Sequence, residues 1–157
     1  MTRRLPTIHG ITEHDAGPYR MERMDLEFSN GERRKYERLH GRGHGAVAVV
    51  PMLDAETVLL VREYAAGVHR YELGLVKGRI DVGETPLEAA NRELMEEAGY
   101  GARDLYPKRL PGDEPEALEL VPWKLADIGE LILREEFSEG RSVAALFIAR
   151  EWLQQQR

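Results

Sequence analysis

The alternation of apolar and charged residues predicts strands in the N-terminal part of the chain. Met24, Leu26 and Phe28 alternate with acidic residues, which is the pattern of a strand with one buried face. The Asn-Gly pair at 30–31 favours a tight hairpin turn, and residues 33–40 are expected to return as the partner strand. Because residues 33–40 are rich in charge, this strand should form an exposed edge or a surface covered by another subunit.

Longer apolar runs follow. Residues 46–53 form a continuous apolar run, which is typical of a buried strand. Residues 57–64, 70–73 and 118–123 are predicted as further strands. The glycine-rich stretch at 41–45 is expected to be a flexible connector.

One helix has complete boundary signals. Thr85 can serve as N-cap, Pro86 fits the first helical position, and Glu88 completes a capping box. Gly99 follows the last helical residue, where a left-handed cap is favoured. The expected apolar stripe of this helix consists of Leu87, Ala90, Leu94 and Ala98, with Ala89 and the glutamates Glu93, Glu96 and Glu97 on neighbouring faces.

Two more helices are predicted at 125–136 and 142–155. Together with the strands they indicate an α+β sandwich in which helices cover a mixed sheet, preceded by a small antiparallel hairpin. The corresponding domain division places the N-terminal β-hairpin region at 1–44 and the main domain at 45–157.

The composition restricts the possible partners. The 157 residues carry a net charge of −6. The sequence therefore does not show the excess of positive charge that is typical of proteins that bind nucleic acid or an anionic membrane. The sequence contains no cysteine, so disulfides and thiol chemistry are excluded and a cytoplasmic location is expected. No stretch has the length and hydrophobicity of a transmembrane span, and residues 1–20 are too polar for a signal peptide.

The glutamates of the well-capped helix suggest chemistry. Glu93, Glu96 and Glu97 stand at i, i+3 and i+4, so a helix projects them from one face. Carboxylates this close repel one another unless a cation joins them, and a divalent metal that prefers oxygen ligands is the natural candidate. Taken alone, however, a glutamate-rich helical face is more often a solvated surface.

The spacing around these glutamates is more specific. The segment GRIDVGETPLEAANRELMEEAGY at 78–100 resembles the signature of the Nudix hydrolases, GX5EX7REUXEEXGU, where U is a bulky apolar residue. Leu94 fills the first U position. Tyr100 occupies the last, where an aliphatic residue is more usual. The other fixed positions are all present.

The resemblance extends over most of the chain. Segments at 25–38, 58–78, 112–116 and 137–153 look like the bacterial ADP compounds hydrolase group within this superfamily. The resemblance implies a Nudix-type α/β/α sandwich and hydrolysis of the pyrophosphate bond in ADP-ribose, NADH or diadenosine polyphosphates, with release of AMP. It also implies a homodimer in which N-terminal strands help to form the partner's site.

The family's residue roles transfer to matching positions. The resemblance implies Mg²⁺ as cofactor, with Mn²⁺ as a possible substitute. It implies that Arg92 orients the glutamates by charge-assisted hydrogen bonds. The implied metal-binding positions are Glu93, Glu96, Glu97, Glu84 and the backbone around Gly78.

The sequence defines the contacts to the substrate less clearly than it defines the metal ligands. Arg62 could bind a phosphate or pair with Glu63 or Glu72, and the phosphate is favoured because an acidic protein must hold an anion. Glu72 is either a metal or substrate contact or a surface residue, and Lys77 either meets phosphate or is solvated.

The sequence also leaves open which residue is the general base and which residue stacks on the adenine of the substrate. One of Glu114 and Glu116 could supply the base, with Glu116 favoured, although an acidic loop is most often only solvated. Tyr36, Tyr64 and Tyr71 could stack on adenine, but packing is the commoner role for a single tyrosine. The five histidines show no metal-ligand spacing and have no expected catalytic role.

The chain departs from the family after Leu105. Family members continue there with a strand, a loop and a second strand, whereas this chain passes directly to Tyr106 and the acidic loop. The junction reflects either a true internal deletion or a stretch missing from this sequence. The second is favoured because the loss of central strands would expose a large apolar face.

Two other functions remain to be compared. A catalytically silent Nudix-fold sensor would usually have lost the glutamates of the signature, whereas all of them are present in this sequence. An RNA 5′-end pyrophosphohydrolase would keep the signature but would need a basic surface, which the acidic composition disfavours. The sequence does not choose among the ADP-linked substrates or between the phosphorus atoms to be attacked.

Overall fold

The computed structural model describes residues 4–17, 19–40, 43–101 and 115–156. The chain divides into two compact units, Met1–Gly43 and His44–Arg157. The junction at Leu105, where the sequence departs from the family, and Glu114 lie outside the described residues.

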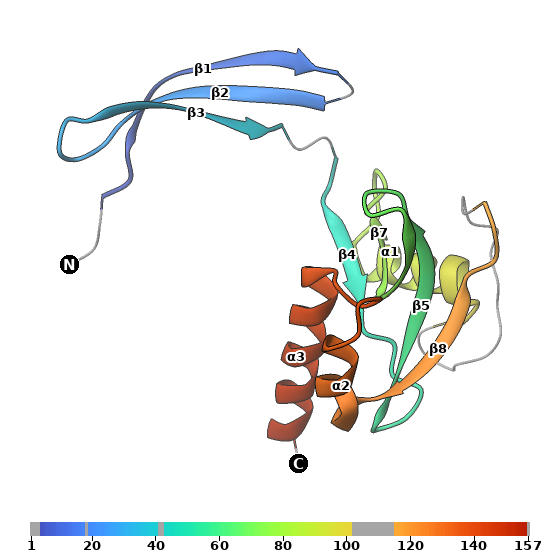
Figure 1. Ribbon diagram of the computed structural model, residues 1–157. Coiled ribbons are helices and arrows are strands. Elements are labelled where there is room, and N and C mark those ends of the chain that lie inside the picture. Colours follow the sequence, from blue (N-terminus) through green and yellow to red (C-terminus); the bar gives the residue numbers. More distant parts are fainter. Residues whose placement is uncertain (1–3, 18, 41–42, 102–114, 157) are drawn as a thin grey trace. The chain divides into compact units, whose positions relative to one another are not determined.

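The first unit is a three-stranded antiparallel meander. It consists of β1 (Thr7–Ala16), β2 (Tyr19–Glu27) and β3 (Arg33–Leu39), in that order across the sheet (Figure 1). The predicted hairpin between β2 and β3 is confirmed, and Gly31 adopts a φ of 82° in its turn. Strand β1 was not predicted, because few of its residues are apolar and none is buried.

One face of this sheet is apolar over part of its length. Cross-strand partners share a face, and the register pairs Ile8 with Leu26, Ile11 with Met24, and Met24 with Tyr36. Ile8, Ile11 and Tyr36 are each about half exposed. The apolar face therefore has no layer of described residues from its own unit packed over it.

The described part of the second unit contains two small antiparallel sheets. Strand β5 (Thr57–Ala65) lies between β6 (Arg70–Gly74) and β8 (Glu119–Lys124), and β4 (Ala46–Val49) pairs with β7 (Val76–Arg79). The strands predicted at 57–64, 70–73 and 118–123 are confirmed, and every strand pair in the described part of the chain is antiparallel.

The prediction of a buried strand at 46–53 is wrong in two respects. The strand covers only Ala46–Val49, and its residues alternate between exposed and half-buried. Among the described residues β4 pairs only with β7, and beyond it Met52 makes an isolated antiparallel bridge with Val58 of β5. Met52 and Val50 pack instead against the edge of the core.

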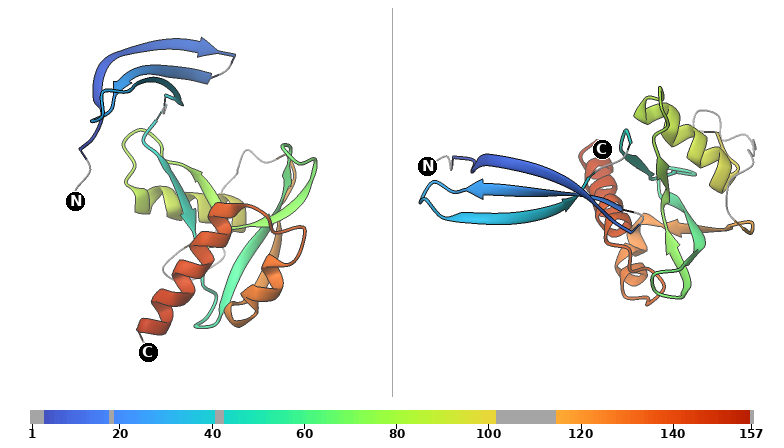
Figure 2. Two further views of the ribbon diagram at one scale, coloured as in Figure 1. Left: turned by 60° about the vertical axis from the view of Figure 1, so that its left-hand side comes forward. Right: turned by 90° about the horizontal axis from the view of Figure 1, so that it is seen from above.

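Strand β5 organises the layers because both of its faces are covered (Figure 2). Val58 and Leu60 belong to the core shared with α2 (Ile128–Ile132) and α3 (Gly140–Gln155). Leu59 and Val61 point to the opposite side and pack with Leu94 and Ala98. This alternation of two buried faces produces the expected sandwich of helices about strands.

The capped helix forms with the predicted boundaries. Helix α1 (Pro86–Glu93) begins with a capping box in which the Thr85 hydroxyl accepts from the Glu88 N–H and the Glu88 carboxylate accepts from the Thr85 N–H. It continues as a π-helical turn, Leu94–Ala98, and ends at Gly99, whose φ is 72°. The π turn was not predicted.

The predicted faces of this helix need correction. Leu87 is 75% exposed, whereas Ala89, Glu93 and Glu97 are buried. Leu94 and Ala98 of the expected stripe are buried as predicted. The buried face therefore departs from the prediction at Leu87, and it also includes two carboxylates. Tertiary contacts decide this, because the helix packs across β7 and β4 with Glu93 against Gly78.

The two C-terminal helices were predicted with different accuracy. The helix predicted at 125–136 is shorter: a 3₁₀ turn, Leu125–Asp127, leads into α2, which ends at Ile132. Beyond it the Glu136 carbonyl accepts a hydrogen bond from the Leu73 N–H, so this segment pairs with β6 rather than continuing the helix. Helix α3 confirms the prediction at 142–155.

Helix α3 is the longest described helix, and its start is fixed by a side-chain cap. Glu139 accepts hydrogen bonds from the Ser142 N–H and hydroxyl at 2.7 and 2.8 Å. Burial of Glu139 opposes ionisation, but hydrogen bonds from Arg141 and Ser142 outweigh it and hold the Glu139 pKa at about 2. None of the helices in the described ranges is both long and apolar enough to span a membrane.

We predict that Glu139→Gln destabilises the protein by about 0.5–2 kcal/mol at pH 7, the usual range for loss of an N-cap. Since the folded-state pKa lies below the ordinary value of 4.5, the stabilisation is complete above pH 4.5 and is lost as the pH falls towards 2. The difference in unfolding free energy between wild type and variant should therefore shrink across this window in denaturant titrations.

Glu130→Gln is the matched control, because Glu130 is exposed on α2. It should change stability by less than about 0.5 kcal/mol. A pH-independent difference for Glu139→Gln would contradict the assignment of the ionised cap.

Candidate active site

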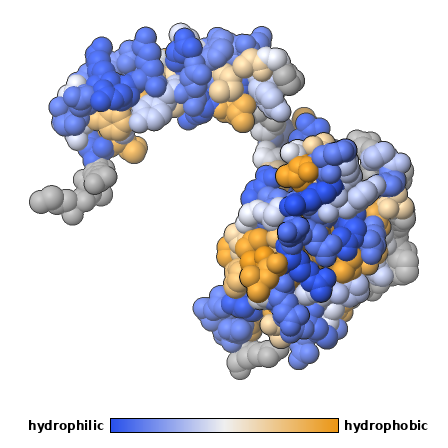
Figure 3. All heavy atoms as spheres, in the orientation of Figure 1, coloured by the Kyte–Doolittle hydropathy of each residue, from blue (hydrophilic) through white to orange (hydrophobic). Residues whose placement is uncertain are grey.

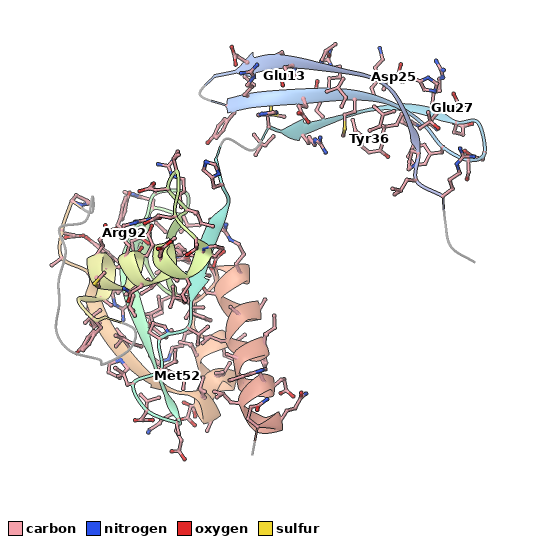
Figure 4. All side chains as sticks on the ribbon, turned by 180° about the vertical axis from the view of Figure 1, so that it is seen from behind. Glu13, Asp25, Glu27, Tyr36, Met52 and Arg92 are labelled. Carbon is pink, nitrogen blue, oxygen red and sulfur yellow. The ribbon has the colours of Figure 1, made fainter. Side chains whose placement is uncertain are left out.

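Residues 78–97, which carry the glutamates, form one wall of the candidate active site. Gly78 belongs to β7, Arg92 and Glu93 end α1, and the π turn carries Glu96 and Glu97. Helix α1 packs directly on β7, so strand and helix bring these residues together. Figure 4 shows Arg92 on α1.

Arg92 uses all its donors within this wall. Nε and Nη2 donate to the two oxygens of Glu84 at 2.8 and 3.0 Å. Nη1 donates to Glu93 at 2.8 Å and to Glu96 at 3.0 Å, and Nη2 also donates to the Arg79 carbonyl at 2.8 Å. The planar guanidinium thereby fixes three carboxylates and the end of β7 in one arrangement.

These contacts shift the protonation equilibria. The hydrogen bonds to Glu84, followed by those to Glu93, raise the pKa of Arg92 above its ordinary value. The guanidinium and the Asp81 N–H in turn lower the pKa of Glu84 to about 2. Glu84 is therefore ionised at neutral pH and held in a fixed orientation.

Gly78 is required by the position of Glu93. A Cβ at residue 78 would lie 1.9 Å from the Glu93 carboxylate, a distance that atoms do not tolerate. The backbone of β7 thus forms a cradle against which the carboxylate rests, and only glycine permits it.

The oxygen donors of the site suit a bound cation. Glu93 and Glu97 are 8% and 7% exposed, and Glu84 and Glu96 lie beside them at the same guanidinium. Arg92 donates to Glu84, Glu93 and Glu96, so three carboxylate groups converge at one guanidinium. A hard divalent cation with oxygen ligands fits this donor set.

Arg62 is already engaged by protein carboxylates. Its Nε donates to Glu119 at 2.8 Å and its Nη1 to Glu136 at 2.5 Å, and the bond to Glu136 raises the Arg62 pKa. The alternative partners expected from the sequence, Glu63 and Glu72, are not among these contacts.

The other candidates lie on β6, β7 and the start of the β8 region. Glu72 accepts from the Ser138 hydroxyl at 2.6 Å, Lys77 donates to Glu63 at 2.8 Å, and Glu116 accepts from the Tyr71 hydroxyl. Lys77 immediately precedes Gly78 in the sequence.

The tyrosines make ring contacts within their own units. Tyr64 meets His69 and Tyr71 edge-on at centroid distances of 5.9 and 5.8 Å. Tyr36 lies 6.4 Å from Phe28. Each of the three tyrosines remains 42 to 50% exposed, so stacking on adenine stays a prediction.

A cavity of about 240 Å³ was not anticipated from the sequence. It lies between β5, β6 and the start of α3, and Glu63, Glu72, Lys77, Glu139 and Ser142 are among its lining residues. No sequence motif marks it, since Glu63 and Glu139 are 76 positions apart.

A group of possible metal ligands also occurs in the first unit. Ligand atoms of Glu13, Glu22 and His40 lie within 4.8 Å of one another, a proximity that sequence spacing does not reveal. Arg20 pairs with Glu13, and Arg38 donates to Glu22 at 2.6 Å. Because arginines already balance both carboxylates, we assign no role to this group.

Comparison with protein families gives two matches. Residues 42–144 match the model of the NUDIX domain, and residues 6–38 match that of the NudE-type Nudix hydrolase N-terminal domain. The range 6–38 falls within the first unit, and the range 42–144 covers most of the second unit and begins two residues before it.

Individual proteins are also similar. The ADP compounds hydrolase NudE of Escherichia coli K12 is 45% identical over 96% of this chain and 95% of its own length. The ADP-ribose pyrophosphatase of Bacillus subtilis 168 is 35% identical over 52% of this chain and 43% of its own length. A crystal structure of an ADP compounds hydrolase superposes with a TM-score of 0.88 at 42% identity, covering 99% of this chain and 98% of that one.

The fold match confirms the predicted sandwich. The match to the E. coli protein extends over 177 residues, more than the 157 of this chain, so the relative carries residues that have no counterpart here.

We predict that Gly78→Ala destabilises the protein by about 1–3 kcal/mol, the usual cost of overpacking. The new Cβ would displace the Glu93 carboxylate from its cradle and weaken its bond with Arg92. Denaturant titration measures the loss. Gly67→Ala is the control, because a Cβ there meets nothing within 4 Å. Equal stability of the two variants would show that the position of the Glu93 carboxylate does not depend on Gly78.

Proposed function

The chain belongs to the Nudix hydrolase family, and from this premise we propose that it hydrolyses the pyrophosphate bond of ADP-linked compounds with release of AMP. ADP-ribose, NADH and diadenosine polyphosphates are the proposed substrates. The observation that carries the proposal is the arrangement of Arg92 and the buried glutamates against Gly78. The similarity to the E. coli ADP compounds hydrolase over nearly the whole chain supports the choice of substrate.

We propose Mg²⁺ as the cofactor, with Mn²⁺ as a possible substitute. Glu93, Glu96 and Glu97, with Glu84 and the backbone at Gly78, would hold the metal. When bound, the metal would polarise the phosphoryl oxygens and neutralise charge on the leaving phosphate. The hard oxygen donors gathered on this wall support the assignment.

The protein's own residues would position the reactants. Arg92 holds Glu84, Glu93 and Glu96 in place and so keeps their separation constant during the reaction. Lys77, next to Gly78, would attract the anionic substrate. Glu116 is proposed as the general base that accepts the proton of the attacking water, and the hydrogen bond from Tyr71 orients its carboxylate.

Arg62 and Glu72 remain proposed substrate contacts. The guanidinium of Arg62 is shared between Glu119 and Glu136, so a phosphate would have to replace or join one of these carboxylates. We further propose a cytoplasmic enzyme, in keeping with the absence of cysteine.

The test is an assay for AMP release from ADP-ribose, NADH and diadenosine triphosphate with and without Mg²⁺. Glu97→Gln should lower Mg²⁺-dependent turnover by about 100-fold or more, because a metal ligand supplies several kcal/mol of transition-state stabilisation. Glu135→Gln is the control, since Glu135 is exposed after α2. Turnover of Glu97→Gln within a few-fold of wild type would exclude the metal-ligand assignment.

We also propose that the protein is a homodimer that uses the apolar face of the N-terminal sheet. That face carries Ile8, Ile11 and Tyr36, which are exposed in the single chain. Apolar surface also gathers over α3, where Ile148 and Trp152 are 69% and 59% exposed (Figure 3). Contiguous apolar surfaces of this kind mark interaction sites.

Ile11→Asp should shift the protein from dimer to monomer, as measured by sedimentation velocity, because it places a charge in the proposed interface. Thr12→Asp is the matched control, since neighbouring residues of a strand lie on opposite faces of the sheet. A wild-type monomer, or a dimer unaffected by Ile11→Asp, would refute this interface.

A further inference from the structure

A second cavity, of about 420 Å³, lies in the second unit away from the glutamates. Its walls come from the turn before β5, the 3₁₀ turn after β8 and the last turns of α3. Among its lining residues, Leu125 and Leu153 belong to the core on the α2 and α3 side of β5. Leu94 and Ala98 of the glutamate-bearing turn pack on the opposite side of this strand. The cavity is therefore separate from the candidate active site.

Arg150 is the most enclosed charged group that lines this cavity, with a side chain that is 30% exposed. Its guanidinium lies over the Phe147 ring, with Cζ 4.6 Å from the ring centroid, which fixes its position on α3. Nη2 donates to Glu151 at 3.3 Å, which is long beside the usual charge-assisted bond of about 2.7 to 2.9 Å. Nε is buried and has no hydrogen-bond partner in the described part of the chain. Arg150 is thus a positioned cation with incomplete hydrogen bonding.

The other charged groups of the lining limit the charge of a ligand. Lys124 donates to the Thr57 hydroxyl at 2.8 Å and lies 3.9 Å from Glu56, so it already has partners. Glu56 and Asp127 are both exposed to solvent. A ligand with one negative charge would complement Arg150, whereas a second negative charge would be repelled by these two carboxylates. The lining therefore favours a monoanion.

The remaining lining is largely apolar. Ala55, Leu125, Ala126 and Leu153 contribute to the walls, and Leu125 is only 7% exposed. An apolar chain or ring would displace water from these walls, which favours binding in proportion to the area covered. A carboxylate is the monoanion whose planar pair of oxygens matches a guanidinium.

We propose that this cavity is a binding site for an amphipathic monocarboxylate, that is, a carboxylate attached to an apolar chain or ring. The carboxylate accepts hydrogen bonds from Arg150 and replaces its long contact with Glu151. The apolar body lies against Leu125 and Leu153. None of these residues takes part in the proposed hydrolysis, so this site stands or fails independently of it.

The test compares four probes with the same six-carbon chain by isothermal titration calorimetry at pH 8. These are hexanoate, 1-hexanol, hexylamine and hexyl phosphate. Wild type should bind hexanoate about tenfold or more tightly than 1-hexanol, because only the carboxylate forms charge-assisted hydrogen bonds with Arg150. Hexylamine should bind more weakly because it is a cation. Hexyl phosphate should bind more weakly because it brings about two negative charges towards Glu56 and Asp127.

Two variants separate the charge from the shape of the cavity. Arg150→Gln should weaken hexanoate binding about tenfold or more and change 1-hexanol binding less than about twofold. Ala126→Leu keeps Arg150 and narrows the cavity, so it should weaken the binding of both probes severalfold. Arg34→Gln is the control, because Arg34 is an exposed arginine of β3 in the first unit, and it should change neither affinity. Thermal unfolding of each variant verifies that the fold is retained.

Four results would overturn the proposal. Equal affinity of wild type for hexanoate and 1-hexanol, or unchanged hexanoate binding in Arg150→Gln, would show that Arg150 does not bind the carboxylate. Tighter binding of hexylamine or hexyl phosphate than of hexanoate would contradict the preference for a single negative charge. Unchanged affinity for both probes in Ala126→Leu would place the bound molecule outside this cavity.

Discussion

The guanidinium of Arg92 is the interaction on which the glutamate site depends. It joins the loop before α1, α1 itself, the π turn and the end of β7 through hydrogen bonds of 2.8 to 3.0 Å. A lysine could not replace it, because an ammonium group offers three donors from one point, whereas these acceptors surround a planar fork. The arrangement also needs Gly78, since any Cβ there would occupy the space of the Glu93 carboxylate.

The fold supports the contacts of Arg92 because β5 is buried on both of its faces. Its residues alternate between the core beneath α2 and α3 and the core beneath the π turn. The second of these cores holds Leu94 and Ala98, and so fixes the turn that carries Glu96 and Glu97. The distance between helix and strand, which the Arg92 contacts require, is therefore set by apolar packing elsewhere.

The features that the sequence allowed us to predict are those with local causes. The capping box at Thr85, the left-handed Gly99 and the hairpin at Gly31 each depend on a few neighbouring residues. The exposure of Leu87 and the burial of Glu93 were not predictable in this way, because they follow from the rotation of α1 on β7. The partners of Arg62 were missed for a similar reason, since Glu119 and Glu136 are 57 and 74 positions away.

The two groups of carboxylates differ in what compensates them. Arg92 uses all five of its donors, and four of its hydrogen bonds hold Glu84, Glu93 and Glu96 on one wall. Glu63 and Glu72 instead have separate partners, since Lys77 donates to Glu63 and Arg70 donates to Glu72. Loss of Arg92 would therefore affect three carboxylates at once, whereas loss of Lys77 or Arg70 would affect only one.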